Sequence, residues 1–231
     1  PDKLVYFKPD NADFSYTSSD LISFFDKKEI DQLLVINPDN PSGNLLSKAE
    51  LLSLLEWSKQ KSIRLLIDES FLDFARTDDS LSLLDTQTLR DNPQLVVIKS
   101  ISKSYGVPGL RLGFLASGDT QLIQQLKREV SIWNINSFAE FYMQIEEKYK
   151  KDYARSLELI RAERARFRRE LEKLPNLRVI PSQANYLMVE LLGGLSARAI
   201  TRELLVNRCI LVKDLSPKLG GQQYLRLAVR D

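Results

Sequence analysis

Short apolar runs that end in polar residues alternate with amphipathic segments along most of this chain of 231 residues. The apolar runs have the length of buried strands, and they cover residues 33–36, 64–67, 95–99 and 113–116. Helical periodicity occupies residues 18–25, 48–61 and 120–128, and an extended segment covers 4–7. Strands that alternate with helices favour a largely parallel sheet with crossover helices, although a local hairpin is open for the 113–116 run. The pattern predicts an α/β fold.

The last part of the chain changes character. A helix from about Ser137 leads into a long helical zone over residues 152–174, and one more helix covers 197–207. Strand patterns cover residues 178–180, 185–189, 210–212 and 224–229. Such a mixture is typical of an α+β unit. We therefore predict a large domain over residues 1–145 and a small C-terminal domain over residues 146–231, without a flexible linker.

The most informative local motif surrounds Lys103 in Ser100-Ile101-Ser102-Lys103, with Arg111 eight residues after the lysine. The motif begins where the 95–99 strand ends. Serine and arginine side chains bind phosphate, and a lysine in a partly desolvated pocket near another cation loses its proton below its usual pKa of about 10.4. Such an amine can bond to an aldehyde carbon. Taken alone, a Ser-x-Ser-Lys match is more often an ordinary loop with solvated basic residues.

Two further strand ends carry polar side chains. The segment Asn37-Pro38-Asp39-Asn40-Pro41-Ser42-Gly43 follows the first strand, and it predicts a rigid turn that holds an asparagine amide against a ligand oxygen. Asp68 ends the second strand, and ligands of α/β proteins bind at the carboxyl ends of strands. Each segment also has an ordinary explanation. The turn is then a connection to the helix that the Ser47–Glu50 capping box starts, and Asp68 is then a solvated strand end or the cap of the next helix.

Arg226 lies near the C-terminus in Tyr224-Leu225-Arg226-Leu227-Ala228-Val229. The alternation predicts a half-buried strand on which Arg226 shares a face with Tyr224 and Ala228. A guanidinium on an otherwise apolar face requires an anion, and its planar fork suits a carboxylate. The alternative is an edge-strand arginine that faces water.

In this order the four motifs resemble those of the pyridoxal-phosphate-dependent aminotransferases of fold type I, class I/II. Within that group they look most like the histidinol-phosphate aminotransferases and the threonine-phosphate decarboxylases. The resemblance extends from about Leu33 to the C-terminus. It implies part of a three-layer fold type I large domain with a mostly parallel sheet, followed by a small α+β C-terminal domain. It also implies a pyridoxal 5′-phosphate cofactor, a small-molecule amino acid or keto acid substrate, and a homodimer.

The resemblance assigns roles to residues of this chain. Lys103 matches the lysine that forms the internal aldimine and moves the proton at the substrate's α-carbon. Asp68 matches the aspartate that pairs with the pyridine nitrogen, and so makes the ring an electron sink. Asn40 matches an asparagine that binds the phenolic oxygen beside the substrate, and Arg226 matches the arginine that binds the substrate carboxylate. The residues that match ligands of the cofactor phosphate are Ser100, Ser102 and Arg111.

Two departures from the family pattern matter. Many members carry a tyrosine three residues after the aspartate, where this chain has Phe71, which the threonine-phosphate decarboxylase branch tolerates. Members are also considerably longer at the N-terminus, where they carry a phosphate-binding loop, an aromatic residue that stacks on the cofactor, and a tyrosine that reaches the neighbouring subunit. Nothing before Leu33 matches those elements. We therefore expect an N-terminally truncated chain that is weakly active or inactive by itself.

Composition narrows the possible classes. Lys and Arg number 33 against 31 Asp and Glu, so the net charge of +2 gives no general attraction to nucleic acid. No apolar run is long enough to span a membrane, and no signal peptide is visible. The chain has no histidine, which excludes histidine-based triads and most zinc sites, and we expect no metal. The single cysteine, Cys209, indicates a reducing compartment such as the cytoplasm, and we expect it to be packed.

Two other segments have competing interpretations. The arginine-rich run from Arg161 to Arg169 is interleaved with glutamates at suitable spacings, so a solvated helix with pairs Glu158–Arg161 and Arg166–Glu170 is favoured over a nucleic-acid contact. The segment Trp133-Asn134-Ile135-Asn136 predicts a helix stop and restart, with Asn136 or Ser137 as the cap. By resemblance, a similar segment lies near the substrate entrance.

Three functions are compatible with these observations. The first, which we favour here, is transfer of an amino group between an amino acid or amino-phosphate and a 2-keto acid by way of Lys103. The second is decarboxylation of a phospho-amino acid on the same scaffold, which Phe71 suggests. The third is a non-catalytic domain with a degenerate transferase fold. The intact set of lysine, aspartate, asparagine and arginine argues against the third.

Overall fold

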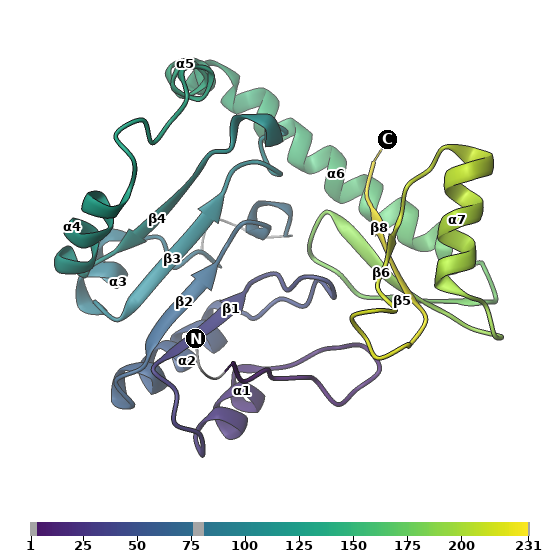
Figure 1. Ribbon diagram of the computed structural model, residues 1–231, viewed down its shortest axis with the longest axis horizontal. Helices are drawn as coiled ribbons and strands as arrows, with labels where there is room; N and C mark the ends of the chain where they lie inside the picture. Colours follow the sequence, from purple (N-terminus) through teal and green to yellow (C-terminus); the bar gives the residue numbers. More distant parts are fainter. Residues whose placement is uncertain (1–3, 76–80, 231) are drawn as a thin grey trace.

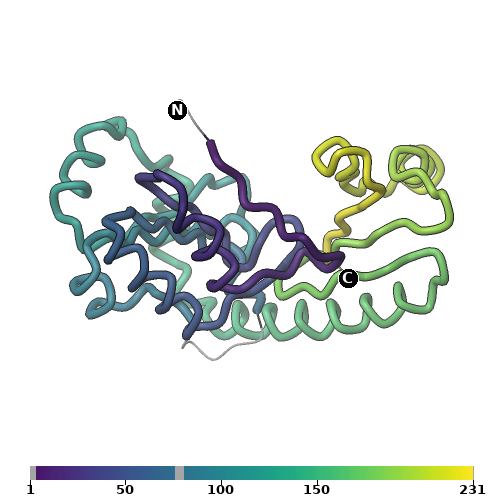
Figure 2. The backbone as a smooth tube through the Cα atoms, turned by 90° about the horizontal axis from the view of Figure 1, so that it is seen from below, coloured from purple at the N-terminus to yellow at the C-terminus, as the bar shows by residue number. Residues whose placement is uncertain are grey.

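Two separate four-stranded sheets, linked by one long helix, organise the computed structural model, which describes residues 4–75 and 81–230 (Figure 1). The first sheet has the order β1–β2–β3–β4, and the second has the order β5–β6–β8–β7. We call the parts around them the large lobe and the small lobe. Helix α6, Lys150–Leu171, runs beneath both lobes in Figure 2. The predicted boundary between residues 145 and 146 stays a prediction, because α6 contacts both lobes.

The first sheet confirms the predicted strands and the largely parallel pairing. Strand β1, Gln32–Ile36, is parallel to β2, Arg64–Asp68, which is parallel to β3, Leu95–Ser100. Strand β4, Gly113–Ser117, runs antiparallel to β3, so the pairing left open by the sequence is a hairpin. The register places Asp68 beside both Ile36 and Ile98. The three parallel strands therefore end at the same edge of the sheet, and the predicted site residues of the large lobe lie at or after these strand ends.

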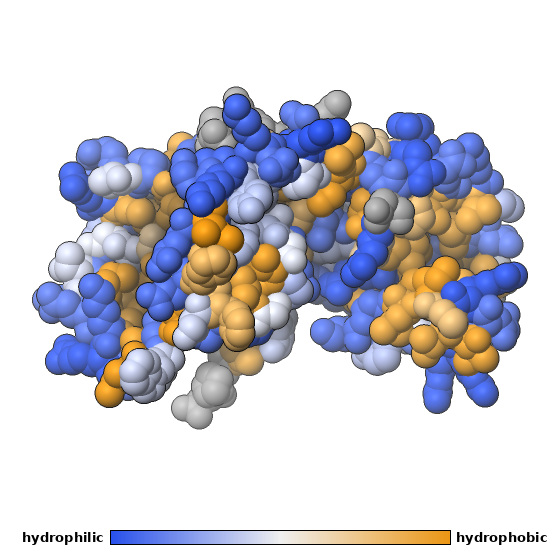
Figure 3. Space-filling model, turned by 90° about the horizontal axis from the view of Figure 1, so that it is seen from above, coloured by the Kyte–Doolittle hydropathy of each residue, from blue (hydrophilic) through white to orange (hydrophobic). Residues whose placement is uncertain are grey.

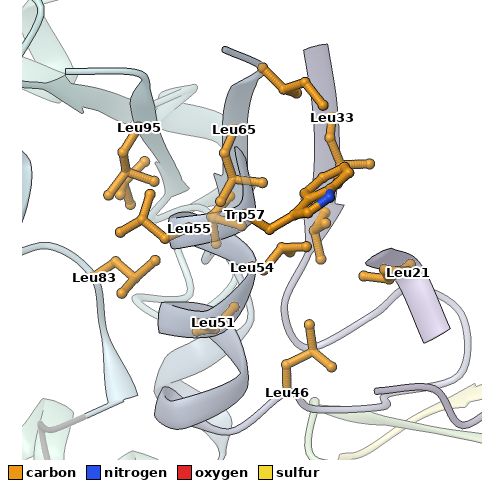
Figure 4. Packing of buried hydrophobic residues seen from close by; sticks show 14 of the residues in the cluster. Leu21, Leu33, Leu46, Leu51, Leu54, Leu55, Trp57, Leu65, Leu83 and Leu95 are labelled. Carbon is orange, nitrogen blue, oxygen red and sulfur yellow. The ribbon is translucent and has the colours of Figure 1, made fainter. Parts of the chain in front are cut away.

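Helix α2, Lys48–Gln60, carries the main core of the large lobe. As predicted, Ser47 and Glu50 form a capping box, in which the Ser47 hydroxyl accepts from the Glu50 amide and the Glu50 carboxylate accepts from the Ser47 amide. The apolar face of α2 packs against the strands in Figure 4, and Leu51, Leu54 and Leu65 are fully buried. Burial of such side chains contributes roughly 1.5–3 kcal/mol each, so this packing holds the edge in place.

The other helices of the large lobe are shorter. Helix α1 confirms the prediction for residues 18–25, and the short α3 was not predicted. The bounds are α1, Ser18–Phe25; α3, Thr86–Asp91; α4, Thr120–Glu129; and α5, Ser137–Ile145. Among the 3₁₀ turns are η1, Leu72–Phe74; η3, Pro108–Leu110; and η4, Glu146–Tyr149. The extended segment predicted at residues 4–7 pairs with neither sheet.

The small lobe is an antiparallel sheet with one helix against it. Its elements are β5, Leu177–Ile180; β6, Tyr186–Leu191; α7, Ala197–Arg208; β7, Lys213–Asp214; and β8, Tyr224–Ala228. The strand predicted at 210–212 is wrong, because those residues form the connection that follows the end of α7 at Arg208. Cys209 adopts φ 54°, and the Ile210 amide donates to the Leu204 carbonyl oxygen, which delays the strand until Lys213. We expected Cys209 to be packed, but it is exposed.

The arginine-rich part of α6 also differs from the prediction. Arg161 and Arg164 turn inward and donate to backbone carbonyl oxygens of the large lobe. The intrahelical pairs that form are Arg166–Glu163 and Arg168–Glu172 instead of the predicted ones. Only the outer face of the segment is therefore a solvated, ion-paired helix surface.

The far side of the large lobe is much less covered than the α2 side. Helix α4 has no buried residue, and Ile132, Trp133 and Phe138 are 93 %, 89 % and 79 % exposed. Figure 3 shows apolar patches interrupting the hydrophilic surface of both lobes, with a notch between the lobes. Across residues 4–75 and 81–230, no helix combines the length and the apolar character required to cross a membrane.

Candidate active site

Asp68 is the last residue of β2, and two neighbouring segments fix its surroundings. Its carbonyl oxygen accepts from the Asn37 amide at 2.9 Å, and its Oδ1 accepts from the Ser70 amide at 2.9 Å. The side chain is half buried at the carboxyl edge of the sheet. The hydrogen bond from the Ser70 amide occupies one carboxylate oxygen of Asp68, and it therefore fixes the direction in which the carboxylate points.

A chain of serine contacts connects Asp68 to the lysine loop. The Ser70 hydroxyl accepts from the Ser100 amide at 2.9 Å, and the Ser100 hydroxyl accepts from the Ser102 amide at 3.3 Å. Ser102 is 6 % exposed, so the loop enters the interior just before Lys103. Sequence reasoning missed Ser70, although its place two residues after a strand-end aspartate was a usable signal. The structure thus brings Asp68, Ser100 and Ser102 into one network.

Lys103 itself is exposed, and among the described residues its amine has no hydrogen-bond partner. It lines a cavity of about 380 Å³ whose wall includes Tyr105 and Tyr153. Those two rings stack with centroids 4.1 Å apart, which joins the lysine loop to α6. The amine therefore stands on an anchored loop and is open to a ligand.

Arg111 lies at the other end of the lysine loop. It has a φ of 56°, a left-handed conformation, and it is exposed, with its Nη1 donating to the Pro108 carbonyl oxygen at 3.3 Å. Asn136 caps α5, as predicted, by accepting from the Ala139 amide, and its Nδ2 donates to the Leu110 carbonyl oxygen at 3.0 Å. The Trp133–Asn136 segment is thus attached to the residue just before Arg111.

The turn after β1 uses its first asparagine for structure. The Asn37 side chain is 1 % exposed and makes two hydrogen bonds to the backbone of Leu46, at 2.8 and 3.3 Å. Asp39 accepts from the amide and the hydroxyl of Ser42, and burial raises the pKa of its carboxyl above the ordinary 3.8. The turn is therefore rigid, and it leaves Asn40 exposed at its tip.

Arg226 meets Asn40 across the two lobes. Its Nη1 donates to Asn40 Oδ1 at 2.6 Å, between residues 186 positions apart in the chain. The Arg226 guanidinium also lies 5.1 Å from the ring centre of Tyr186. The sequence motif placed Arg226 on a strand, and the structure adds that this strand delivers it to the turn that carries Asn40.

Tyr186 is a second residue that sequence reasoning missed. Its hydroxyl donates to the Asp39 carbonyl oxygen at 2.5 Å, and its ring packs edge to face on Phe71 with centroids 5.3 Å apart. Burial, followed by the nearby Asp39 carboxylate, raises the pKa of Tyr186 above its usual value. An aromatic residue at the start of the strand predicted at 185–189 was the only signal available.

Among the described residues, hydrogen bonds join Asp68 to the serine loop and Asn40 to Arg226, whereas no side-chain contact joins Lys103 or Arg111 to these groups. The set as a whole offers an amine, an oriented carboxylate, a hydroxyl-rich loop with an arginine, and an amide–guanidinium pair. It suits a ligand that offers an aldehyde, a ring nitrogen and a phosphate, beside a substrate that offers a carboxylate. Among the described residues, no group of three or more Cys, Asp or Glu side chains is placed to hold a metal ion.

Comparisons with known proteins agree with this chemistry. Residues 3–230 match the pattern of the family described as aminotransferase class I and II. The chain is 35 % identical, over 99 % of its length, to CMP-5′-(3-aminopropyl)phosphonate synthase of Streptomyces rubellomurinus, of which it covers 36 %. It is 32 % identical, over 99 % of its length, to L-serine phosphate decarboxylase of Sulfurospirillum multivorans, of which it covers 59 %.

A solved structure gives the same result for the fold. The histidinol-phosphate aminotransferase of Clostridium acetobutylicum superposes with a TM-score of 0.85 at 27 % identity, over 98 % of this chain and 66 % of that one. The predicted fold type I architecture is therefore confirmed. The chain spans about one third to three fifths of the length of the curated relatives named above.

Proposed function

We propose that this chain, which belongs to the class I and II aminotransferase family, carries the catalytic groups of an enzyme that breaks a bond at the α-carbon of a small amino acid. Enzymes of this family depend on pyridoxal 5′-phosphate. When bound, that cofactor supplies an electron sink for the bonds at the substrate's α-carbon. The observation that carries the proposal is the 2.6 Å contact between Arg226 and Asn40, which lies on the turn after β1, next to the strand that ends at Asp68.

Each residue has a separate task in this proposal. Lys103 is the amine that would bond to the cofactor aldehyde. It would later hold the proton that joins the α-carbon after carbon dioxide leaves, or the proton that leaves the α-carbon in amino transfer. Asp68 keeps a proton on the ring nitrogen, because a carboxylate favours a cation next to it. Asn40 donates from its amide to the phenolic oxygen. The cofactor phosphate is assigned to Ser100, Ser102 and Arg111.

Arg226 binds the substrate carboxylate through its planar guanidinium. Its contact with Asn40 Oδ1 turns the guanidinium toward the edge of the first sheet, and the Tyr186 ring supports it from the small lobe. The substrate is thereby held with its α-carbon over the strand ends. This assignment makes the carboxylate the feature of the substrate that the small lobe recognises.

For the reaction itself we favour decarboxylation of a phosphorylated amino acid. Two observations support this choice over the amino transfer that the motifs first suggested. Phe71 removes a hydroxyl that many aminotransferases of the family direct at the phenolic oxygen, and its ring packs on Tyr186 instead. A relative that is 32 % identical over 99 % of this chain bears the name L-serine phosphate decarboxylase.

Amino transfer to a 2-keto acid is the second candidate. The similarity to a histidinol-phosphate aminotransferase over 98 % of the chain favours it. The residues assigned above serve both reactions, since both begin by loosening one bond at the same α-carbon. The bond that breaks is decided by the orientation of the substrate, and hence by the carboxylate contact.

Substrate profiling of the intact protein, loaded with pyridoxal 5′-phosphate, separates these candidates. We expect O-phospho-L-serine to release carbon dioxide with no keto acid present, and Arg226→Lys to raise KM at least about tenfold. Formation of a new amino acid only when a 2-keto acid is added would establish amino transfer instead. No visible absorbance band after the cofactor is added and the protein desalted would support the non-catalytic alternative.

We further propose a cytoplasmic homodimer. The single cysteine supports a reducing compartment, and the exposed apolar side chains around Trp133 and Phe138 offer a surface for a second copy. Light scattering on the intact protein tests the dimer. A mass equal to one chain at micromolar concentration would contradict it.

A further inference from the structure

Helix α6 places one arginine where the two lobes meet. The Arg164 side chain is 8 % exposed, and its Nη1 donates at 2.9 Å to the carbonyl oxygen of Phe74 in the large lobe. The same nitrogen donates at 2.7 Å to the carbonyl oxygens of Gln183 and Ala184, which precede β6 in the small lobe. Nη2 donates to Gln183 Oε1 at 3.2 Å. One guanidinium therefore holds both lobes.

The segment that Arg164 holds leads directly to the contact between Asn40 and Arg226, which is assigned to the substrate carboxylate. The Gln183 amide donates to the Gly43 carbonyl oxygen at 2.9 Å, which fastens it to the turn that bears Asn40. Ser182 packs so closely on Gly43 that a Cβ on the glycine would lie 2.0 Å from the serine hydroxyl oxygen. Tyr186, three residues after Gln183, reaches the same turn through its hydroxyl.

Arg226, the other partner in the contact with Asn40, is held by the sheet of the small lobe. Met188 of β6 pairs with Arg226 of β8, so the position of β6 sets the position of the Arg226 backbone. Phe74 ends the turn that follows Asp68 and Phe71, and it is fully buried. Arg164 thus binds the last residue of that turn and the first residues that lead into β6.

We infer that Arg164 is a positioning residue for substrate binding: it fixes the distance between Asn40 and Arg226, and with it the affinity for the substrate carboxylate. The inference rests on the proposed role of Arg226. A lysine cannot replace this guanidinium, because it is a point charge and lacks the planar fork that serves acceptors from two lobes at once. One arginine of the arginine-rich run of α6, Arg164, therefore serves the active site rather than the helix surface.

The test compares Arg164→Lys with the unaltered protein, both intact and loaded with pyridoxal 5′-phosphate. Two probes are titrated while the visible absorbance of the cofactor is followed: O-phospho-L-serine, and O-phosphoethanolamine, which lacks the carboxylate. We expect the Kd of O-phospho-L-serine to rise about tenfold and that of O-phosphoethanolamine to change less than about twofold. Equal changes for both probes, or no change in a folded variant, would overturn the inference.

Arg161→Lys is the matched control. Arg161 lies on the same helix and donates to the carbonyl oxygens of Ala75 and Asp73, at 3.0 and 2.9 Å, which both belong to the large lobe. It should lower the unfolding temperature as Arg164→Lys does, with no change in the ratio of the two Kd values. If Arg161→Lys shifts that ratio equally, general loosening explains the effect and the inference fails.

Hydrogen exchange gives a readout that does not depend on substrate. In protein without substrate, Arg164→Lys should speed amide exchange in residues 183–187 and in 72–75, whereas Arg161→Lys should speed it in 72–75 alone. If the unaltered protein binds neither probe, the proposed function fails, and the exchange pattern still decides whether Arg164 couples the lobes. Unchanged exchange in 183–187 would show that it does not.

A milder variant covers the case in which Arg164→Lys does not fold. Gln183→Met removes only the 3.2 Å contact with Nη2 and keeps the backbone contacts. It should shift the ratio of the two Kd values in the same direction by a smaller factor. A ratio equal to that of the unaltered protein would count against the inference.

Discussion

The two lobes contribute to the site by different means. The large lobe presents Asp68, Ser100 and Lys103 at or just after strand ends, so neighbouring positions in the chain settle where these side chains lie. The small lobe presents Tyr186 and Arg226 from within a sheet, and these reach the site only through contacts with a turn some 150 positions or more away in the chain. In the proposed function, local sequence therefore places the groups that carry out the chemistry, whereas substrate binding depends on how the two lobes meet.

Lys103→Ala tests a group of the large lobe that local sequence places, and it should have the largest effect of the variants described below. Removing the amine takes away both the bond to the cofactor and the proton carrier, so activity should fall by roughly a thousandfold or more. Borohydride reduction followed by mass spectrometry should find the cofactor attached to the unaltered protein and absent from the variant. Lys127→Ala, at an exposed position on α4, is the control and should retain it.

Gly43→Ala tests the contact between the lobes. The glycine has a φ of +80°, and a Cβ would lie 2.8 Å from the Cα of Ser182, so the turn and the small lobe must separate. We expect a loss of about 2–4 kcal/mol in the free energy of unfolding. Gly106→Ala provides the control, because it has a φ of +66° with nothing within 4 Å and should cost only about 1–2 kcal/mol. Equal losses in urea denaturation would mean that the contact contributes nothing.

Tyr186→Phe removes one hydrogen bond between the lobes and keeps the ring. The Asp39 carbonyl oxygen loses its phenol donor, so stability should fall by about 1–2 kcal/mol. The ring packing on Phe71 and the support of Arg226 should persist. Urea denaturation beside Tyr149→Phe, a ring that is 54 % exposed, measures the difference. A loss no larger than that of Tyr149→Phe would assign the link between the lobes to other contacts.

Asp39→Asn should have the smallest effect, and one that depends on pH. Burial raises the pKa of this carboxyl above 3.8, so the folded protein binds more protons than the unfolded chain above that pH. The contribution of Asp39 to stability is complete below pH 3.8 and is lost as the pH rises through the raised value. Stability measured across this range should fall less with pH in the variant. Identical pH profiles would show that Asp39 does not titrate differently in the folded state.

Much of the fold could be predicted because its signals are local. The strand ending at Asp68, the capping box at Ser47 and the cap at Asn136 each depend on residues within a few positions. The strand predicted at 210–212 failed because a helix C-cap at Cys209 takes those residues first. Local patterns specify elements well, except where two of them compete for the same segment.

The site was only partly predictable for the same reason. The motifs identified Asn40 and Arg226 separately, and their roles stay predictions, but the structure shows that the two touch. Ser70, Arg164 and Tyr186 were not identified as site residues, because their partners lie 30, 90 and 147 positions away. The place of Ser70 after Asp68 and of Tyr186 at a strand start were the only local signals, and neither identifies the distant partner; Arg164, in a charged helix, has no such signal.

The exposed end of α7 has a practical consequence. Cys209 is the single thiol of the 231-residue chain, and it sits at the surface of the small lobe. A maleimide dye therefore attaches at one place without any engineered cysteine. Trp57, buried in the core of the large lobe, is a native fluorophore on the other side of the junction. Energy transfer from tryptophan to a dye at Cys209 can report, in real time, whether ligand draws the lobes together.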